Sequence, residues 1–547
     1  MDNNLENQNG KKEKSIKIGI IVFVFILILA IAFLLVVVFK NKTNVDKSKN
    51  NLASNVEVEK SKYWIANNSL QAFDLYFLQL EKTENKVYSP LSIKYALKML
   101  ETGAEGEAKA QISSVIGEYK SKKYTNSKNL SLANGIFVRD TYSDVKESYV
   151  SVLQEKYGAE VKKDSFMTAN NINKWVNGKT LGLINNLLDD DTVKNSNFFL
   201  LNALAIDMEW NEKFILRPGM GMGAYYSHEN FFWNGDSHLV AREFEGSDEE
   251  VSGMEIIASL NNYDIVTTLG EENIKNTVRE ELKKYLKENN ETMRDYFKYS
   301  ENGDEEGKYT NYTEDELIED YLDEYIKEID ENYKRVDKTT EFSFYVDDNV
   351  KTFAKDLKEY DGTTLQYIGI MPVNSDLDTY VKNVNYTDIN NIIGNLKELK
   401  SENFKEGVVT KIFGFIPKFK LEYELALKDD LKKLGVTKVF EQGNANLINI
   451  SDNKELYITS VKHKSNIEFT QEGIKAAAAT TIGGGGAGSW FDYKFEVPVE
   501  EIDLTFNKPY MFIIRDKDTG EVWFIGTVYN PLLYSKDTTA KAIDYDE

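Results

Sequence analysis

The feature that most restricts how this chain can fold is an uncharged apolar run near its N-terminus. Twenty-two consecutive residues, Ile18–Phe39, carry no charge. A helix of that length spans about 33 Å, enough to cross a hydrocarbon core of roughly 30 Å. A cleaved signal peptide has a shorter apolar region that ends in small residues, which this run lacks. We therefore predict an uncleaved transmembrane helix at 18–39, with a tail at 1–17 and a polar stalk at 40–62.

The lysines around this run do not decide its orientation. Four lysines precede it and four follow it, so the positive-inside count is a tie. They are Lys11, Lys12, Lys14 and Lys17 before the run, and Lys40, Lys42, Lys47 and Lys49 after it. The orientation therefore has to follow from what the C-terminal region does.

Composition excludes several classes of protein. The 547 residues are 41% hydrophobic, which is enough to bury a sizeable core, and the length alone suggests three or four domains. The net charge of −23 argues against a nucleic-acid partner. The absence of cysteine excludes disulfides and zinc–thiolate sites. With three histidines and no HExxH or GxSxG motif, we expect no enzyme, no metal site and no cofactor.

Residues 63–535 carry the pattern of one globular α+β region, and a polar tail follows at 536–547. Apolar residues recur with helical spacing over Leu91–Leu100 and from Ile172 to Leu188. The stretch Phe198–Ile206 is too short to span a membrane and is typical of a buried strand. Helical patterns come first and strand patterns later, which predicts an α+β fold around a large sheet.

An acidic segment interrupts the globular pattern at about residues 217–338. Over residues 271–340, acidic residues outnumber basic residues by 22 to 12. Large apolar residues recur at every fourth position over Ile318–Ile326, which predicts a helix with one apolar stripe in a solvated accessory insertion. Calcium binding by Asn302, Asp304, Glu305 and Glu306 is the disfavoured alternative, because their spacing departs from that of a calcium-binding loop.

The most informative segment is rich in alanine and glycine, at residues 468–489. With a period of two, one face of a strand carries Ile474, Ala476, Ala478, Thr480 and Ile482, and the other carries Lys475, Ala477, Ala479 and Thr481. The first face suits a core and the second suits solvent, and the glycines that follow favour an exposed, protease-accessible loop. A plain linker is one alternative. A phosphate-binding G-x-G-x-x-G loop is disfavoured, because a strand-like segment follows it.

Together with other motifs, this segment resembles the serpin family. The matching motifs, in order along the chain, are Val87–Ile93, Leu132–Phe137, the Ile172–Ile184 pattern, Asn202–Leu204 with Trp210, Ile416–Lys420 and Phe506–Tyr510. They cover roughly residues 63–535 apart from the insertion. The resemblance implies a serpin fold, in which a large central sheet with helices carries an exposed reactive-centre loop. We expect a membrane-anchored, bacterial member of the family.

The resemblance also implies the activity, which is suicide inhibition of serine proteases, with cysteine proteases as the alternative target. The protease attacks the loop and forms an acyl-enzyme, and the loop then inserts into the central sheet. With the family's usual loop length counted from Gly473, the scissile bond falls at Ala487–Gly488, which suits elastase-like or subtilisin-like enzymes. The stretch from Gly488 to Thr505 is long for the family, so Trp490, Phe491 and Tyr493 are later candidates for the bait.

Two groups of residues carry the implied insertion step. The hinge comprises Gln471, Glu472, Gly473, Ile474, Ala476, Ala477, Ala478, Ala479 and Thr480. A cluster at the opening point of the sheet comprises Ser89, Ser92, Asn202 and His463, with Trp210 at the breach. Three features depart from the family pattern. Gln471 replaces a common glutamate, Ile474 replaces Thr or Ser, and the glycines of 483–486 have poor strand propensity.

A non-inhibitory binding module on the membrane surface is the alternative function. Its hinge is expected to be charged, bulky or proline-bearing, and residues 476–482 are none of these. Since the proteases that such a family meets are mostly extracellular, we expect a single-pass cell-membrane protein with an exported C-terminal region. We expect this region to be a monomer that binds extracellular serine proteases and no nucleic acid.

Overall fold

The computed structural model describes the folded region in several stretches. They are residues 59–80, 83–141, 145–212, 214, 240–261, 265–299, 309, 311–333, 337–338, 340–471, 473–474, 491, 495 and 498–534. The predicted transmembrane helix at 18–39 and the tails at 1–17 and 536–547 lie outside these residues, as does the stalk up to residue 58. Within the stretches given above, no helix is long and apolar enough to cross a bilayer.

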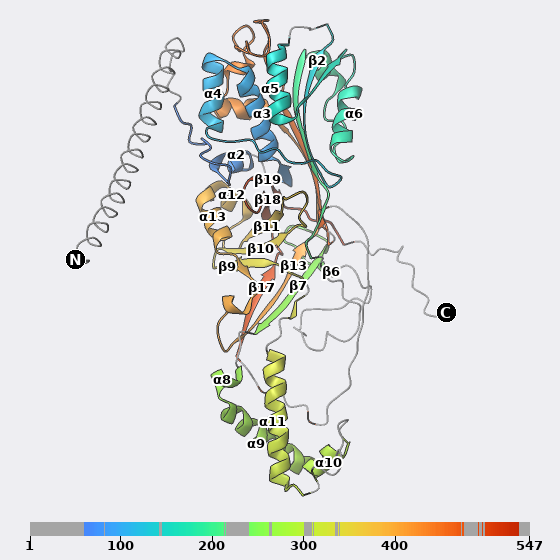
Figure 1. The fold of residues 1–547 in the computed structure, drawn as a ribbon, viewed down its shortest axis with the longest axis vertical. Helices are drawn as coiled ribbons and strands as arrows, with labels where there is room; N and C mark the ends of the chain where they lie inside the picture. The colour runs from blue at the N-terminus through green and yellow to red at the C-terminus, as the bar shows by residue number, and fades with distance from the viewer. Residues whose placement is uncertain are drawn as a thin grey trace, which may run out of the picture. The chain divides into compact units, whose positions relative to one another are not determined.

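A seven-stranded sheet has the most strands of the four sheets that the structure describes. Its strands, in spatial order, are β1 (Lys86–Tyr88), β19 (Val522–Val528), β18 (Tyr510–Asp516), β11 (Leu365–Pro372), β10 (Val350–Asp356), β9 (Ser343–Val346) and β12 (Lys397–Glu398). All residues of β11 and β19 are buried, as expected where both faces of a sheet are covered. Figure 1 shows α12 (Leu377–Asn383) and α13 (Tyr386–Gly394) beside these strands.

A second sheet contains part of the segment that composition assigned to the insertion. Its strands are β17 (Val499–Thr505), β13 (Val409–Pro417), β7 (Val251–Asn261) and β6 (Val240–Arg242), and β8 (Asp337–Lys338) pairs with β7. Met254 and Ile256 of β7 are buried in the main hydrophobic core. Strands β6 and β7 therefore belong to the folded body, although they lie within 217–338.

The accessory part of that segment is a separate group of helices, called here the helical module. It consists of α8 (Ile265–Leu269), α9 (Glu271–Asn289), α10 (Met293–Tyr299) and α11 (Glu314–Tyr333), which are grouped together in Figure 1. The predicted apolar stripe lies on α11, which confirms a helix there. Three ion pairs, one per helical turn, connect antiparallel α9 and α11. They are Lys275–Asp323, Arg279–Glu319 and Lys283–Asp315.

The third and fourth sheets contain the strands on either side of Gly473 and Ile474. One has the order β14 (Phe419–Ala426), β15 (Lys462–Phe469), β16 (Gly473–Ile474) and β5 (Met208–Glu209), and the other has the order β3 (Glu160–Asp164), β2 (Leu130–Arg139) and β4 (Phe198–Ile206). Strand β4 has the bounds that the sequence predicted. Only Asp207 separates β4 from β5, so the two sheets share one continuous segment of chain.

Helices pack on these sheets. They are α2 (Ala72–Leu80), α3 (Pro90–Gly103), α4 (Gly106–Ile116), α5 (Glu147–Tyr157), α6 (Asn170–Lys179), α7 (Asp190–Lys194) and α14 (Leu427–Lys433), with 3₁₀ turns η2 (Ser401–Asn403) and η3 (Lys438–Phe440). The predicted helix over Leu91–Leu100 is confirmed as part of α3. The continuation of the next helix to Leu188 is wrong, because α6 ends at Lys179. Leu181 and Gly182 have φ of 54° and 78°, which a right-handed helix does not allow.

A buried ion pair joins two of the helices behind the central strands. Asp74 of α2 and Lys94 of α3 are both fully buried, and their charged atoms lie 2.5 Å apart. The backbone N–H of Gln71 also donates to the Asp74 carboxylate at 2.8 Å. Burial raises the pKa of Asp74, and the charge of Lys94 opposes that rise. The two side chains therefore form a close ion pair that is shielded from solvent.

We expect Lys94→Met to destabilise the native fold by about 3–5 kcal/mol, because it leaves the Asp74 carboxylate buried without a counter-ion. The double variant Asp74→Asn with Lys94→Met should recover most of that loss, since the amide oxygen introduced at position 74 can still accept from Gln71. The thermal unfolding midpoint measures both effects. Lys109→Met, on the exposed side of α4, is the control and should change little. A double variant as unstable as Lys94→Met would contradict this account.

Candidate functional site

Two residues of the predicted hinge form a strand between two others. Ile474 of β16 lies opposite Phe469 of β15 on one side and opposite Met208 of β5 on the other. Gly473 lies opposite Glu209. Phe469 and Met208 are fully buried, and directly opposed residues of neighbouring strands share a face. Position 474 therefore stands on the core face, as the alternating pattern predicted for the hinge.

The strands that flank β16 continue beyond it with one hydrogen-bonded edge each. Strand β4 pairs with β2 along its whole length, from Leu130↔Ile206 to Val138↔Phe198. Strand β15 pairs with β14 along its whole length, from Phe419↔Phe469 to Ala426↔Lys462. Among the strands that the structure describes, none pairs with the second edge of β4, and only Ile474 pairs with the second edge of β15. The site thus consists of the second edges of β4 and β15, which face each other, with β16 between their ends.

The outward face of β15 contacts the segment that follows α6. Lys464 Nζ donates to the Asn185 carbonyl at 3.1 Å, and Asn466 Nδ2 donates to the Leu183 carbonyl at 3.0 Å. Ile184, Leu187 and Leu188 of the same segment pack with residues of β4 in a second hydrophobic cluster. The segment therefore connects the two strands whose facing edges define the site. Its role was missing from the sequence analysis, because the pattern there was interpreted as helix.

His463 accepts a hydrogen bond from another element at the centre of the site. The backbone N–H of Ser89, which caps α3, donates to His463 Nε2 at 2.9 Å, and Ser465 Oγ lies 2.9 Å from the same nitrogen. The Ser89 hydroxyl in turn accepts from the backbone N–H of Ser92 at 3.1 Å. Burial lowers the pKa of His463 to about 4. The ring is therefore neutral at pH 7, which its role as an acceptor requires.

Asn202 lies on β4, on the same core face as His463 of β15, but it bonds to a different partner. Its Nδ2 donates to Asn134 Oδ1 of β2 at 2.6 Å, and Asn134 Nδ2 donates to the Tyr157 carbonyl at 2.7 Å. Asn202 Oδ1 is buried without a hydrogen-bond partner among the described residues. The structure thus brings Ser89, Ser92 and His463 together and leaves Asn202 on the opposite edge. Asn134 lies in the Leu132–Phe137 motif but was not singled out as a site residue, and Ser465 lay outside the motifs.

Trp210 closes the end of the site where β16 lies. Its Nε1 donates to the Thr470 carbonyl at 2.9 Å, and its ring packs edge-on against Phe469 with 5.3 Å between centroids. The side chain is 1% exposed. A backbone bridge from Trp210 to Leu357 connects the same point to the end of β10. Trp210 therefore holds the turn that leads from β15 into the hinge.

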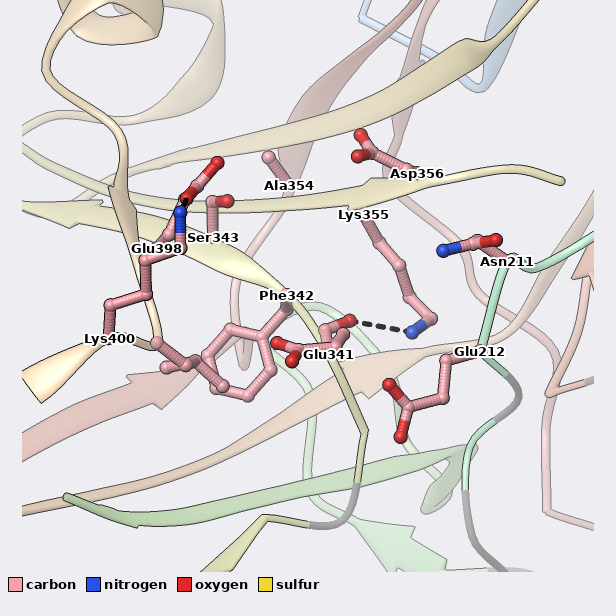
Figure 2. Close-up of a pocket in the computed structure, with 11 residues that line it drawn as sticks. Asn211, Glu212, Glu341, Phe342, Ser343, Ala354, Lys355, Asp356, Glu398 and Lys400 are labelled. Carbon is pink, nitrogen blue, oxygen red and sulfur yellow. Dashed lines mark hydrogen bonds and ion pairs between the residues drawn. The ribbon is translucent and has the colours of Figure 1, made fainter. Parts of the chain in front are cut away.

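A cavity of about 220 Å³ lies next to this turn (Figure 2). Asn211, Glu212, Glu341 and Phe342 line it together with buried Lys355. Lys355 Nζ donates to the Glu341 carbonyl at 2.7 Å and to the Thr340 hydroxyl, and the Thr340 hydroxyl donates to the Glu212 carbonyl at 3.2 Å. These bonds connect the chain after Trp210 to the seven-stranded sheet, which is a structural role.

Part of the predicted site lies outside the described residues. This holds for Glu472, for Ala476, Ala477, Ala478, Ala479 and Thr480, and for the candidate scissile pair Ala487 and Gly488. The acidic residues weighed for calcium binding lie outside them too. Gln471 is described and half-buried. In the described part of the chain, no three acidic, histidine or cysteine residues gather where a metal ion could bind.

Comparison with known proteins identifies the class to which this fold and site belong. The family profile of the serpins (serine protease inhibitors) matches residues 66–218 and 332–531, which together are more than half of the chain. The protein belongs to the serpin family, and the predicted α+β serpin fold is confirmed. Serpins are typically protease inhibitors rather than enzymes. The gap between the two matched segments contains almost all of the helical module.

Individual relatives agree with this assignment over most of their length. Mouse neuroserpin is 24% identical over 471 residues, which cover 82% of this chain and 86% of neuroserpin. Mouse leukocyte elastase inhibitor A is 24% identical over 493 residues, which cover 85% of this chain and 98% of that protein. The native thermophilic serpin tengpin superposes with a TM-score of 0.54 at 20% identity, covering 87% of this chain and 99% of tengpin. Uncleaved ovalbumin superposes with a TM-score of 0.52 at 18% identity, covering 85% of this chain and all of ovalbumin.

We expect the native fold to lose stability as the pH falls from about 6.5 towards 4. The unfolded chain takes up a proton on His463 near pH 6.5, whereas the folded chain does so only near pH 4. The folded state therefore loses up to about 3 kcal/mol relative to the unfolded state across that window. Thermal unfolding of the wild type and of His463→Asn at pH 7 and pH 5 measures this, and the variant should show the smaller loss. Equal losses in both proteins would contradict the prediction.

Proposed function

We propose that this chain is a suicide inhibitor of serine proteases that works by inserting its cleaved loop into the central strands. The observation that carries the proposal is β16, where Gly473 and Ile474 pair with β15 and β5 at one end of two facing strand edges. If β16 continued past Ile474, its backbone could hydrogen-bond to the second edge of β4 and to the second edge of β15. The backbone groups on those edges are strong hydrogen-bonding groups, so each added pair favours continuation.

The register of β16 places the following residues if the strand continues after cleavage. Ala476 would lie opposite Ile467 and Ile206, Ala478 opposite Ser465 and Leu204, and Thr480 opposite His463 and Asn202. These positions follow from the antiparallel pairs at Ile474. Small side chains suit a strand that enters an already packed face. The Thr480 hydroxyl would arrive beside Asn202 Oδ1, the buried acceptor described above.

The chemistry belongs to the attacking protease, and this chain supplies the trap. The protease's serine hydroxyl attacks the bait carbonyl, the peptide bond breaks, and the amine half leaves while the acyl half stays bound as an ester. Insertion of that acyl half then carries the bound protease along the sheet, away from the position where it first bound, and distorts its active site before water cleaves the ester. The bonds from Lys464 and Asn466 to the segment after α6 would have to shift to admit the strand.

The target class and the location are part of the same proposal. The small residues Ala487 and Gly488 favour elastase-like or subtilisin-like enzymes, with cysteine proteases as the alternative, and one relative is named an elastase inhibitor. Because such enzymes act mostly outside cells, we propose a single-pass membrane anchor at 18–39 with the serpin region extracellular. A non-inhibitory, membrane-anchored binding module remains the second candidate. The exposed acidic residues of α11 favour it.

The orientation can be tested on intact cells that express the full chain. Protease added outside should remove the serpin region and leave the segment 1–39 with the membrane, because the stalk at 40–58 would be accessible. Detergent-permeabilised cells provide the control for total cleavable protein. Complete protection of the serpin region in intact cells, together with cleavage after permeabilisation, would rule out an extracellular orientation.

The inhibitory mechanism can be tested with two hinge variants that carry the same new residue on opposite faces. Mixed with an elastase-like or subtilisin-like protease, the wild type should form a covalent complex that survives denaturing electrophoresis. Ile474→Glu should be cleaved at the loop without forming that complex, because a carboxylate facing Phe469 and Met208 opposes insertion. We expect the ratio of cleaved chain to complex to rise by about tenfold or more, given that penalty.

Lys475→Glu is the matched control, since strand alternation would place position 475 on the other face of a continued strand, and this variant should keep the complex. If the wild type is cleaved in the loop without forming a covalent complex, the chain is not an inhibitor of that protease. If no protease of either type forms a complex, the binding module becomes the supported function. If both variants lose the complex, the proposed register is wrong. Sequencing of the cleaved band locates the bait bond.

A further inference from the structure

The helical module encloses an aromatic residue that does not belong to it in sequence. Its core consists of Ile274, Val278, Leu282, Leu286, Met293, Phe297, Leu317, Ile318, Leu322, Ile326 and Ile329, together with Phe491. Phe491 comes from the segment downstream of the loop's glycines, more than 150 residues later in the chain. It is 7% exposed. The module's core therefore includes a side chain from the segment that leads out of the reactive loop.

Two tyrosines of the module hold the ring of Phe491. Tyr285 of α9 packs edge-on against it with 5.3 Å between ring centroids, and Tyr321 of α11 does so at 6.3 Å. Such edge-to-face pairs add to the free energy gained by burial alone. The ring thus contacts both long helices, which the three ion pairs hold side by side.

A backbone contact four residues later repeats the arrangement. The N–H of Phe495 donates to Tyr325 Oη at 3.0 Å, and the Phe495 side chain packs against the same core. Tyr321 and Tyr325 lie one turn apart on α11. Both described residues of this stretch, Phe491 and Phe495, therefore contact tyrosines one turn apart on α11, and Phe491 also contacts α9.

The sheet topology places the root of the module next to this stretch. Strand β7 leads into the module at Asn261, which lies opposite Val409 of β13, and Val409 also lies opposite Val499 of β17. The chain returns from the module through Asp337, which lies opposite Ser259 of β7. The start of β17 is only four residues beyond Phe495. The insertion point of the module and the end of the loop segment therefore share one end of one sheet.

We propose that the helical module is an internal binding site for Phe491 and Phe495 and that it anchors the downstream end of the reactive loop. Phe491 is buried there, so it is withheld from proteases that cut after aromatic residues, and the usable bait lies upstream of it. Naming the loop as bait rests on the proposed function, whereas the anchoring itself does not. The inference favours Ala487–Gly488 over Phe491 as the bait bond, and it keeps the downstream product attached to the module after cleavage.

Limited proteolysis of the purified full-length chain with chymotrypsin tests the anchor. The stretch 490–495 offers Trp490, Phe491, Tyr493 and Phe495 as cleavage sites, and mass spectrometry of the fragments assigns each cut. In the wild type these sites should be cut slowly. In Phe491→Ala, cleavage after Tyr493 and Phe495 should be about tenfold faster or more, because the buried anchor is lost. Val499→Ala, at a half-exposed position in β17, is the control and should match the wild type.

Amide hydrogen exchange tests the anchor with a variant that keeps the aromatic ring of Tyr325 in the core of the module. Tyr325→Phe removes only the hydroxyl that accepts from Phe495, so exchange of the Phe495 amide should accelerate by about tenfold. Amides within α9 and α11 should exchange as in the wild type, which shows that the module still folds. Rapid wild-type cleavage in 490–495, or Phe491→Ala and Tyr325→Phe variants that match the wild type, would overturn the proposal.

The two proposals fail separately. If 490–495 is protected but no protease forms a covalent complex, the anchor stands and the inhibitory function falls. If a complex forms while 490–495 is cut freely in the uncomplexed chain, the function stands and the anchor falls. A bait bond mapped at or after Phe491 would also count against the anchor.

Discussion

The facing edges of β4 and β15 are the constraint on which the rest of this structure depends. Each strand has a complete ladder on its other side, and each would gain a second ladder from one inserted strand. Strand β16 occupies the first two positions that such an inserted strand would take, between β15 and β5. The polar residues around it fit such an arrangement, because His463 and Asn202 bond to partners on their own sides rather than to each other. The two sides of the site are thus separately satisfied, apart from Asn202 Oδ1, the acceptor left open among the described residues.

Much of the fold could be predicted from the sequence, and particular residues show why. The run Phe198–Ile206 predicted the bounds of β4, because a strand covered on both faces is almost continuously apolar, and here Asn202 is the one polar residue. The alternation at Ile474 gave the correct face of β16, because strand periodicity fixes which side chains enter a core. The family assignment needed several motifs in order, since no single motif of this chain is specific.

Other features could not be predicted because they depend on partners far away in the chain. The helix after Ile172 ended at Lys179, since backbone turns at Leu181 and Gly182 are invisible to a count of apolar spacing. Acidic composition extended the insertion over β6 and β7, whose role depends on pairing with β13. Phe491 was weighed only as bait, because nothing in its neighbours reveals that its ring completes a helical core formed by residues 274–329. The aromatic cluster around it was the one available signal.

Different interactions therefore fix the two ends of the segment between β16 and β17. At its upstream end, Gly473 and Ile474 are held by strand hydrogen bonds that can extend one residue pair at a time. At its downstream end, Phe491 is held by burial in a small core that offers no such extension. Cutting the chain between them therefore has unequal consequences: the upstream half can lower its free energy by moving, and the downstream half by staying. If the proposed insertion takes place, the helical module thus gives this serpin fold a fixed downstream end while the upstream strand moves.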